Sequence, residues 1–143
     1  MIDLGCGNGV IGLALLAAEP QAQILFCDES YMAVQSSREN VSRLFPAASH
    51  CEFLVDDSMS QQPDLSADYI LCNPPFHQQN AVTDHIAWQM FSDARRVLKK
   101  NGRLRIVANR HLAYSEKLAR LFGGCIHVAS NAKFTILEAI KRN

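Results

Sequence analysis

The strongest constraint on the fold is an alternation of short apolar segments with helical patterns, which runs from the first residues almost to the last. Strands that alternate with helical segments are typical of parallel sheets with helical crossovers. The sequence therefore predicts an α/β protein with a doubly wound, mostly parallel sheet and a C-terminal antiparallel hairpin. With 143 residues the chain can bury one ordinary core, so we expect a single domain over residues 1–143.

The individual elements follow from hydrophobic periodicity and from turn residues. Strands are predicted at residues 2–4, 23–27, 51–55, 68–72, 103–108, 125–129 and 134–140. Helices are predicted at residues 10–18, from a cap at Ser30 to just before Pro46, from a cap at Asp84 to Asn101 and Gly102, and around 114–122. Because only a tight connection near Asn131 separates the last two strands, we expect them to pair in antiparallel fashion.

Apolar positions predict which helix faces are buried. Helix 10–18 is apolar all round, as expected for a helix that packs against a sheet. The buried face predicted for the helix after Ser30 comprises Ala33, Val34, Ser37, Val41 and Leu44. The face predicted for the helix after Asp84 comprises Ile86, Ala87, Met90, Phe91, Ala94, Val97 and Leu98.

Composition limits the kind of protein. The longest apolar stretch, residues 10–18, is too short to span a bilayer, and Asp3 and Asn8 precede it where a signal peptide would carry basic residues. The five cysteines are odd in number and form no C-x-x-C pair, which argues against a disulfide framework and against a zinc site. We therefore expect a soluble, cytoplasmic protein with reduced thiols, no membrane partner and no metal.

The net charge of zero conceals an asymmetry between the two halves of the chain. Residues 1–72 hold ten acidic and two basic residues, whereas residues 73–143 hold four acidic and twelve basic residues. The basic cluster of the second half consists of Arg95, Arg96, Lys99, Lys100, Arg103, Arg105 and Arg110. On charge alone a solvated face is favoured, and contact with a phosphate backbone is the alternative.

The segment "DLGCGNGVIG" contains two overlapping glycine patterns. Gly7, Gly9 and Gly12 match the dinucleotide-binding spacing, with Asp28 about twenty residues further on. Since the first strand is expected to end at Leu4, the turn begins at Gly5, and the frame Asp3-x-Gly5-x-Gly7-x-Gly9 fits better. Glycines at these positions let the backbone turn sharply and let a ligand touch the main chain.

This second frame resembles the glycine loop of the class I S-adenosylmethionine-dependent methyltransferases, and the likeness extends over nearly the whole chain. The resemblance implies a Rossmann-like methyltransferase sheet with S-adenosyl-L-methionine as the cofactor. It implies that Asp3 orients the turn and the amino-acid end of the cofactor, that Asp28 holds both ribose hydroxyls, and that Asp57 or its neighbour Asp56 binds the adenine amine. The cofactor-binding residues that it implies are Asp3, Gly5, Cys6, Gly7, Asn8, Gly9, Asp28, Glu29, Asp56, Asp57 and Asn73.

A rigid elbow, Asn73-Pro74-Pro75-Phe76, follows the strand 68–72. Two prolines add no competing N–H groups and fix the direction of the Pro74 carbonyl. Asn73 Oδ1 and the Pro74 carbonyl can accept the hydrogens of a conjugated amine, and Phe76 can stack on a planar ring that has left its helix. The elbow resembles the Asn/Asp-Pro-Pro-Tyr/Phe signature of methyltransferases that modify conjugated amines, which implies a catalytic role for Asn73, Pro74, Pro75 and Phe76.

Several longer segments narrow the resemblance: "CNPPFHQQ", "VDDSMS", "CDESYMAVQSSRENV" and "RIVANRHLAY". They are similar to the catalytic domain of the bacterial ribosomal RNA guanine-N2 methyltransferases, the large-subunit enzymes above all and the small-subunit enzymes more distantly. The resemblance implies methyl transfer to the N2 amine of a guanine in ribosomal RNA. His77 and the residues Asn109, Arg110 and His111 are further candidates for the same cleft, or else ordinary surface residues.

The chain starts inside its first strand, so we expect a domain truncated at its N-terminus, which keeps cofactor affinity but acts poorly on RNA without the N-terminal domain that the resemblance implies. Three alternatives stay open. The first is the same chemistry on adenine N6 or on the side-chain amide of protein glutamine. The second is a noncatalytic module that binds the cofactor or RNA, and the third is a dinucleotide-binding module.

Overall fold

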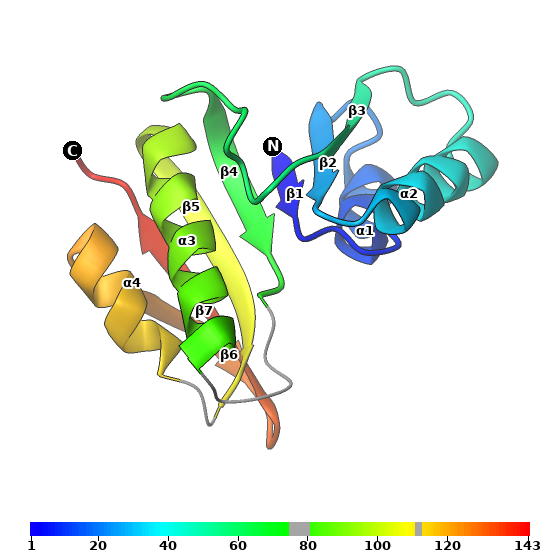
Figure 1. Ribbon diagram of the computed structural model, residues 1–143. Coiled ribbons are helices and arrows are strands. Elements are labelled where there is room, and N and C mark those ends of the chain that lie inside the picture. The colour runs from blue at the N-terminus through cyan, green and yellow to red at the C-terminus, as the bar shows by residue number, and fades with distance from the viewer. Residues whose placement is uncertain (75–80, 111–112) are drawn as a thin grey trace.

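Seven strands pair into one sheet in the computed structural model, which describes residues 1–74, 81–110 and 113–143 (Figure 1). The strands are β1 (Ile2–Leu4), β2 (Ile24–Asp28), β3 (Cys51–Val55), β4 (Ala67–Cys72), β5 (Leu98–Asn109), β6 (Ile126–Ser130) and β7 (Phe134–Ile140). The helices are α1 (Val10–Ala18), α2 (Tyr31–Leu44), α3 (Ala81–Val97) and α4 (Tyr114–Phe122). The predicted α/β class is therefore confirmed.

The strand order is β3-β2-β1-β4-β5-β7-β6. The first five strands are parallel, and β7 pairs in antiparallel fashion with both β5 and β6. Asn131 closes the β6–β7 connection, because its side-chain oxygen accepts hydrogen bonds from the N–H groups of Lys133 and Phe134, each at 2.8 Å. The predicted doubly wound sheet and its C-terminal hairpin are both confirmed.

Helices cover both faces of the sheet, as Figure 1 shows. The larger apolar core lies under α3 and α4, where Phe91 meets Tyr114 edge-on at 5.4 Å between ring centroids. The smaller core lies between α1, α2 and the strands β2 and β3, where Phe26 stacks on Phe53 at 5.0 Å. The sheet is thus held between two layers of helix, with β1 and β4 at its centre.

The predicted bounds of the third helix are wrong at both ends. The helix begins at Ala81, so Asp84 lies within its first turn and pairs with Lys117 at 2.5 Å. It ends at Val97, because Leu98 already pairs with Ala67 of β4. The helix cannot continue to Asn101, since that residue lies within β5 and has a positive φ of 68°.

All three predicted helix faces differ from the structure, since Ile86 of α3 is 37% exposed. In α1 only Gly12 and Leu16 are buried, and Val10 is 61% exposed, because the sheet covers one side of this helix only. In α2 the buried residues are Val34, Ser37 and Val41, whereas Leu44, in the last turn, is 54% exposed. The predicted cap is confirmed, since Ser30 Oγ accepts the N–H of Ala33 at 3.2 Å.

The basic cluster of the second half is not a simple solvated face. Glu138, buried in β7, accepts hydrogen bonds from Arg103 at 2.7 Å, Arg105 at 2.9 Å and Tyr69 at 2.8 Å. Burial acts to raise the pKa of Glu138, but these three hydrogen bonds outweigh it and lower the pKa. Arginines of the cluster therefore neutralise a buried carboxylate and join β4, β5 and β7.

Candidate functional site

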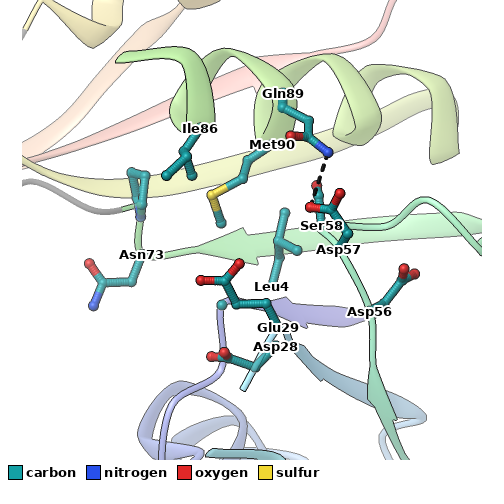
Figure 2. A pocket seen from close by; sticks show the side chains of 12 residues that line it. Leu4, Asp28, Glu29, Asp56, Asp57, Ser58, Asn73, Ile86, Gln89 and Met90 are labelled. Atoms are coloured by element: carbon teal, nitrogen blue, oxygen red, sulfur yellow. Dashed lines mark hydrogen bonds between the residues drawn. The ribbon is translucent and has the colours of Figure 1, made fainter. Parts of the chain in front are cut away.

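One cavity of about 340 Å³ lies at the carboxyl ends of β1, β2 and β4, beside the loop that follows β3 (Figure 2). It is lined by Leu4, Gly5, Asp28, Glu29, Asp56, Asp57, Ser58, Asn73, Pro74, Ile86, Gln89 and Met90. β1 lies between β2 and β4, so the direction of winding changes beside it. Ligands of open α/β sheets bind at such a switch point, outside the carboxyl ends of the strands.

The glycine loop, residues 5–9, connects β1 to α1. Gly5, Gly7 and Gly9 all have positive φ values, of 69°, 55° and 90°, whereas Gly12 lies within the helix. A Cβ on Gly5 would lie 3.3 Å from Met90 Cε and 3.5 Å from the Asn73 carbonyl oxygen, so a side chain there would enter the cavity wall. The geometry favours the frame that starts at Gly5 over the dinucleotide-binding frame.

Asp28 ends β2 and connects the glycine loop to α2. Its Oδ2 accepts the N–H of Gly7 at 3.0 Å, and its Oδ1 accepts the N–H of Ser30 at 2.9 Å. Glu29 follows it and also lines the cavity. Because each Asp28 oxygen has lone pairs left after these bonds, the carboxylate can accept further hydrogen bonds from a ligand.

Asp3 lies in β1 and is almost fully buried, with 1% of its surface exposed. Its Oδ2 accepts the N–H of Gly12 at 3.0 Å, and its Oδ1 has no hydrogen-bond partner within residues 1–74, 81–110 and 113–143. Burial raises the pKa of Asp3 to about 7, the Gly12 N–H counteracts this, and the nearby Asp28 adds to the rise. The carboxyl thus fixes the start of α1 and keeps one unused acceptor.

The other predicted residues of the glycine loop hold the loop in place instead of lining the cavity. Ser37 Oγ of α2 donates to the Gly7 carbonyl at 2.8 Å and contacts Cys6 Sγ at 3.3 Å. Asn40 Nδ2 donates to the carbonyl of Asn8 at 2.9 Å. Burial raises the pKa of Cys6 to about 11, although the Ser37 contact lowers it, so this thiol stays protonated at neutral pH.

The loop between β3 and β4, residues 56–66, supplies the opposite side of the cavity. Asp56 is buried, and its oxygens accept from Ser60 Oγ at 2.5 Å, from the Gln61 N–H at 2.9 Å and from Gln61 Nε2 at 3.4 Å. Asp57 is exposed, and its carboxylate accepts a hydrogen bond from Gln89 Nε2 at 3.2 Å. Of the two acids predicted for an adenine amine, Asp57 therefore has the freer carboxylate.

The elbow after β4 is described only in part. Asn73 and Pro74 line the cavity, and Figure 2 shows Asn73 and Asp57 on opposite sides of it. Pro75, Phe76 and His77 lie outside the described residues, as does His111. Asn109 and Arg110 do not line the cavity. Arg110 donates instead to the Asn131 carbonyl at 3.0 Å.

Three residues that the sequence had not indicated as site residues line the cavity from α3: Ile86, Gln89 and Met90. Ile86 and Met90 belong to the apolar stripe of the helix, which predicts only core packing. Gln89 belongs to a second, polar stripe with Asp93 and Arg96, at positions i, i+4 and i+7. That spacing was a usable signal for a face in contact with another polar segment.

Two further findings concern absences. Among residues 1–74, 81–110 and 113–143, no group of three or more His, Cys, Asp or Glu side chains is arranged to hold a metal ion. Over those same residues, no helix combines the length and the apolar character needed to cross a bilayer.

The parallel sheet, the glycine loop at its switch point and the acids at successive strand ends define the class as an α/β domain of the methyltransferase type. The match to the family model "Methyltransferase small domain" covers residues 1–138, and the chain belongs to this family. The resemblance to methyltransferases is thereby confirmed.

Curated relatives of the chain include two proteins named ribosomal RNA large subunit methyltransferase G. The one from Cronobacter sakazakii is 61% identical over 142 residues, and the one from Serratia proteamaculans is 58% identical over 142 residues. Each alignment covers 99% of this chain and 38% of the relative. The chain thus spans less than two fifths of the length of these curated relatives.

Among solved structures, a T. thermophilus 16S rRNA N2 methyltransferase, RsmC, in complex with AdoMet and guanosine, is similar to the chain. The TM-score is 0.84 at 26% sequence identity, and the alignment covers 99% of this chain and 37% of the other. The strand order and the antiparallel C-terminal pair are therefore those of the methyltransferase fold.

Proposed function

We propose that the chain is a catalytic domain that transfers a methyl group from S-adenosyl-L-methionine to the exocyclic N2 amine of a guanine in ribosomal RNA. The observation that carries the proposal is that Gly5, Asp28, Asp57 and Asn73 line one cavity. Cofactor residues and the first residue of the amine-recognising elbow thus line the same space.

The residues present fit this cofactor. The positive-φ glycines bring bare backbone to the cavity at Gly5, where a side chain would block it. In this proposal Asp28 accepts hydrogen bonds from the ribose hydroxyls and Asp57 accepts one from the adenine amine; both residues line the cavity. Asp3 Oδ1 is an unused buried acceptor beside the glycine loop, suited to a cationic amino group.

S-adenosyl-L-methionine supplies a methyl group bonded to a positively charged sulfur. The task of the chain is to aim a poor nucleophile, because the lone pair of a conjugated amine is delocalised into the ring. Asn73 Oδ1 and the Pro74 carbonyl accept the two amine hydrogens and orient the nitrogen toward the methyl group. The amine nitrogen loses its extra proton to solvent after transfer, so no general base is needed.

Pro75 and Phe76 remain part of the proposal on sequence grounds. Pro75 fixes the direction of the chain after the Pro74 carbonyl, and Phe76 supplies a ring on which a flipped base stacks. Both roles depend on the resemblance of the elbow to the amine-methyltransferase signature.

The relatives support the choice of substrate. The curated relatives are named as large-subunit ribosomal RNA methyltransferases, and the T. thermophilus enzyme is named as an N2 methyltransferase whose structure holds guanosine. We therefore favour guanine N2 in ribosomal RNA, with the cytoplasm as the place of action. Because the chain spans 38% of the relatives' length, RNA docking by further segments of the full-length enzyme is part of the proposal.

Calorimetric titration of this chain with S-adenosylmethionine and S-adenosylhomocysteine, with NADH as the control, tests the cofactor. We expect both methionine-derived ligands to bind and NADH to give no heat. Binding of NADH alone would overturn the proposal in favour of a dinucleotide-binding module.

Incubation of a full-length homologue with ribosomal RNA and methyl-labelled cofactor, followed by nucleoside analysis, tests the substrate. N2-methylguanosine is the expected product. Label in N6-methyladenosine, or in glutamine of added ribosomal protein, would assign the same chemistry to another amine. A chain that binds the cofactor, with no labelled product from any substrate, would indicate a noncatalytic module.

A further inference from the structure

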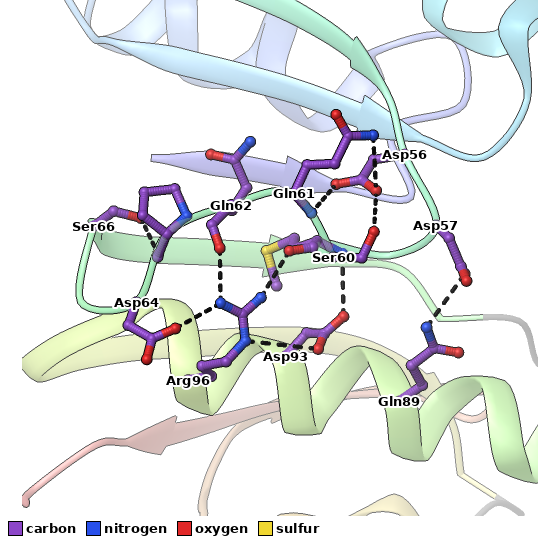
Figure 3. Close-up of polar contacts among 12 residues, drawn as sticks. Asp56, Asp57, Ser60, Gln61, Gln62, Asp64, Ser66, Gln89, Asp93 and Arg96 are labelled. Carbon is purple, nitrogen blue, oxygen red and sulfur yellow. Dashed lines mark hydrogen bonds and ion pairs between the residues drawn. The ribbon is translucent and has the colours of Figure 1, made fainter.

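The polar stripe of α3 consists of Gln89, Asp93 and Arg96, and all three side chains contact the β3–β4 loop (Figure 3). Their spacing of four and then three residues places them on one face of the helix. The apolar residues Ile86 and Met90 of the same helix line the cavity. α3 therefore contacts both the cavity and the segment that forms its far side.

Asp93 and Arg96 bind both backbone polar groups of one residue, Met59. The Met59 N–H donates to Asp93 Oδ2 at 3.2 Å, and Arg96 Nη2 donates to the Met59 carbonyl at 2.8 Å. The Met59 side chain is fully buried in the larger core. Backbone and side chain of this residue are thus both fixed.

Arg96 makes two further bonds to the same loop. Its Nη1 donates to the Gln62 carbonyl at 2.7 Å and to Asp64 Oδ1 at 2.8 Å. The Leu65 N–H in turn donates to the Arg96 carbonyl at 3.2 Å. A guanidinium offers several donors in a fixed plane, so one side chain can hold the loop at several points.

The loop needs such contacts, because no regular helix or strand lies between β3 and β4. Ser58 adopts a φ of 55°, which is an uncommon backbone conformation for a residue with a side chain. Ser58 and Asp57, which precede Met59 directly, line the cavity. Asp57 Oδ1 accepts from Gln89 Nε2 at 3.2 Å, so the stripe reaches the pocket itself.

We propose that Gln89, Asp93 and Arg96 are positioning residues that hold Asp57 against the adenine end of the cofactor, and so set the affinity and base selectivity of the pocket. This inference rests on the proposed function. Helix α3 holds two parts of the cavity in a fixed relative position. One is the wall formed by Ile86 and Met90, and the other is the loop that carries Asp57. Loosening Met59 would release Asp57 without touching the glycine loop.

The test compares Arg96→Met with Arg95→Met. Arg95 is the matched control, since it lies on the same helix and donates to the Leu121 carbonyl at 2.6 Å, away from the cavity. Both variants are titrated with S-adenosylhomocysteine and with S-inosylhomocysteine, in which a carbonyl oxygen replaces the adenine amine. The dissociation constant of S-inosylhomocysteine divided by that of S-adenosylhomocysteine reports on Asp57, because an amine on ring carbon 6 can donate to its carboxylate and a carbonyl oxygen there cannot.

We expect Arg96→Met to weaken S-adenosylhomocysteine binding about tenfold and S-inosylhomocysteine binding less than about twofold, so that the ratio falls. Arg95→Met should leave both constants unchanged, and Arg96→Lys should restore part of the ratio. A lower melting temperature with an unchanged ratio would show that Arg96 only stabilises the fold, and would overturn the proposal.

If Arg96→Met does not fold, Gln89→Leu carries the test, because its single contact with Asp57 lies at the surface. The same fall in the ratio is expected, and an unchanged ratio again overturns the proposal. Failure of the proposed function is a separate result, since the unaltered chain would then bind neither ligand.

Discussion

Two buried carboxylates differ in how fully they are bonded: Asp56, which lines the cavity, and Asp3 of β1, which does not. Asp56 has donors to both oxygens from Ser60 and Gln61, which lie within its own loop. Asp3 has one donor, the Gly12 N–H, and its other oxygen has no partner in the described part of the chain. Asp56 thus completes a local structure, whereas Asp3 keeps one buried oxygen without a partner among the described residues.

The difference extends to the two sides of the cavity. The glycine side consists of β1, the glycine loop and β2. The Asp28 carboxylate accepts the Gly7 N–H, and Ser37 and Asn40 of α2 donate to the carbonyls of Gly7 and Asn8. The loop side consists of residues 56–66, which side chains of α3 hold from more than thirty residues away. A distant helix thus supports each side, but only the glycine side carries a recognisable sequence motif.

The largest expected effect concerns the ionisation of Asp3. Its pKa is about 7 in the folded protein, against roughly 4 in an unfolded chain. Between these two values the folded state keeps its proton and the unfolded state loses it, so rising pH favours unfolding. The contribution of protonated Asp3 to the free energy of unfolding is fully present below about pH 4. It is lost as the pH rises through 7, and the total loss is on the order of 4 kcal/mol.

Urea unfolding of the wild type and of Asp3→Asn, measured from pH 4 to 8, checks this expectation. The unfolding free energy of the wild type, relative to that of Asp3→Asn, should fall across this range and level off above about pH 7. A pH-independent difference for Asp3→Asn would show that Asp3 is already ionised in the folded protein.

The second prediction concerns Asn73, which lines the cavity opposite Asp57 and beside Gly5. On the proposed mechanism, Asn73→Ala removes an acceptor that is used in the transition state, so we expect the rate of methyl transfer to fall about a hundredfold. The dissociation constant for S-adenosylhomocysteine should change less than about twofold. Single-turnover kinetics in the full-length homologue, with calorimetry alongside, separates the two quantities.

The control for this prediction is Asn73→Asp, which keeps a side-chain oxygen at the same distance from the backbone. We expect it to retain much more activity than Asn73→Ala. Equal activity of the wild type and Asn73→Ala would remove Asn73 from the mechanism and favour a noncatalytic module.

The glycine side and the loop side also differ in how much of each could be predicted from the sequence. Sequence analysis placed the glycine turn at Gly5, the carboxylate of Asp28 at a strand end and the cap at Ser30, because each depends on residues within a few positions or on one strand. It missed Gln89 as a pocket residue and extended the third helix past Val97. That helix ends where it does because the N–H groups of Leu65 and Ser66 bind the carbonyls of Arg96 and Val97, and no local pattern reveals such distant partners.

The third prediction tests packing on the glycine side. A Cβ on Gly12 would lie 2.2 Å from Phe26 Cε1, and Phe26 is fully buried against Phe53. Gly12→Ala should therefore lower the unfolding free energy by about 2 kcal/mol, even though alanine favours helix. Gly124→Ala is the matched control, since a Cβ there meets nothing within 4 Å. Equal stability of the two variants, measured by urea unfolding, would mean that Phe26 can move aside at little cost.

The smallest expected effect is on the loop side. In Asp56→Asn the amide oxygen can still accept from Ser60 Oγ and Gln61 Nε2, but the new NH₂ group faces the Gln61 N–H. The loss of one hydrogen bond should lower the unfolding free energy by about 1 kcal/mol. Because Asp3 and Asp56 share no bonding partner, the double variant should show additive changes to within about 0.5 kcal/mol at pH 7. A larger deviation from additivity would mean that the stabilities of the two sides of the cavity are coupled. Ligand contacts on one side would then change the stability of the other side.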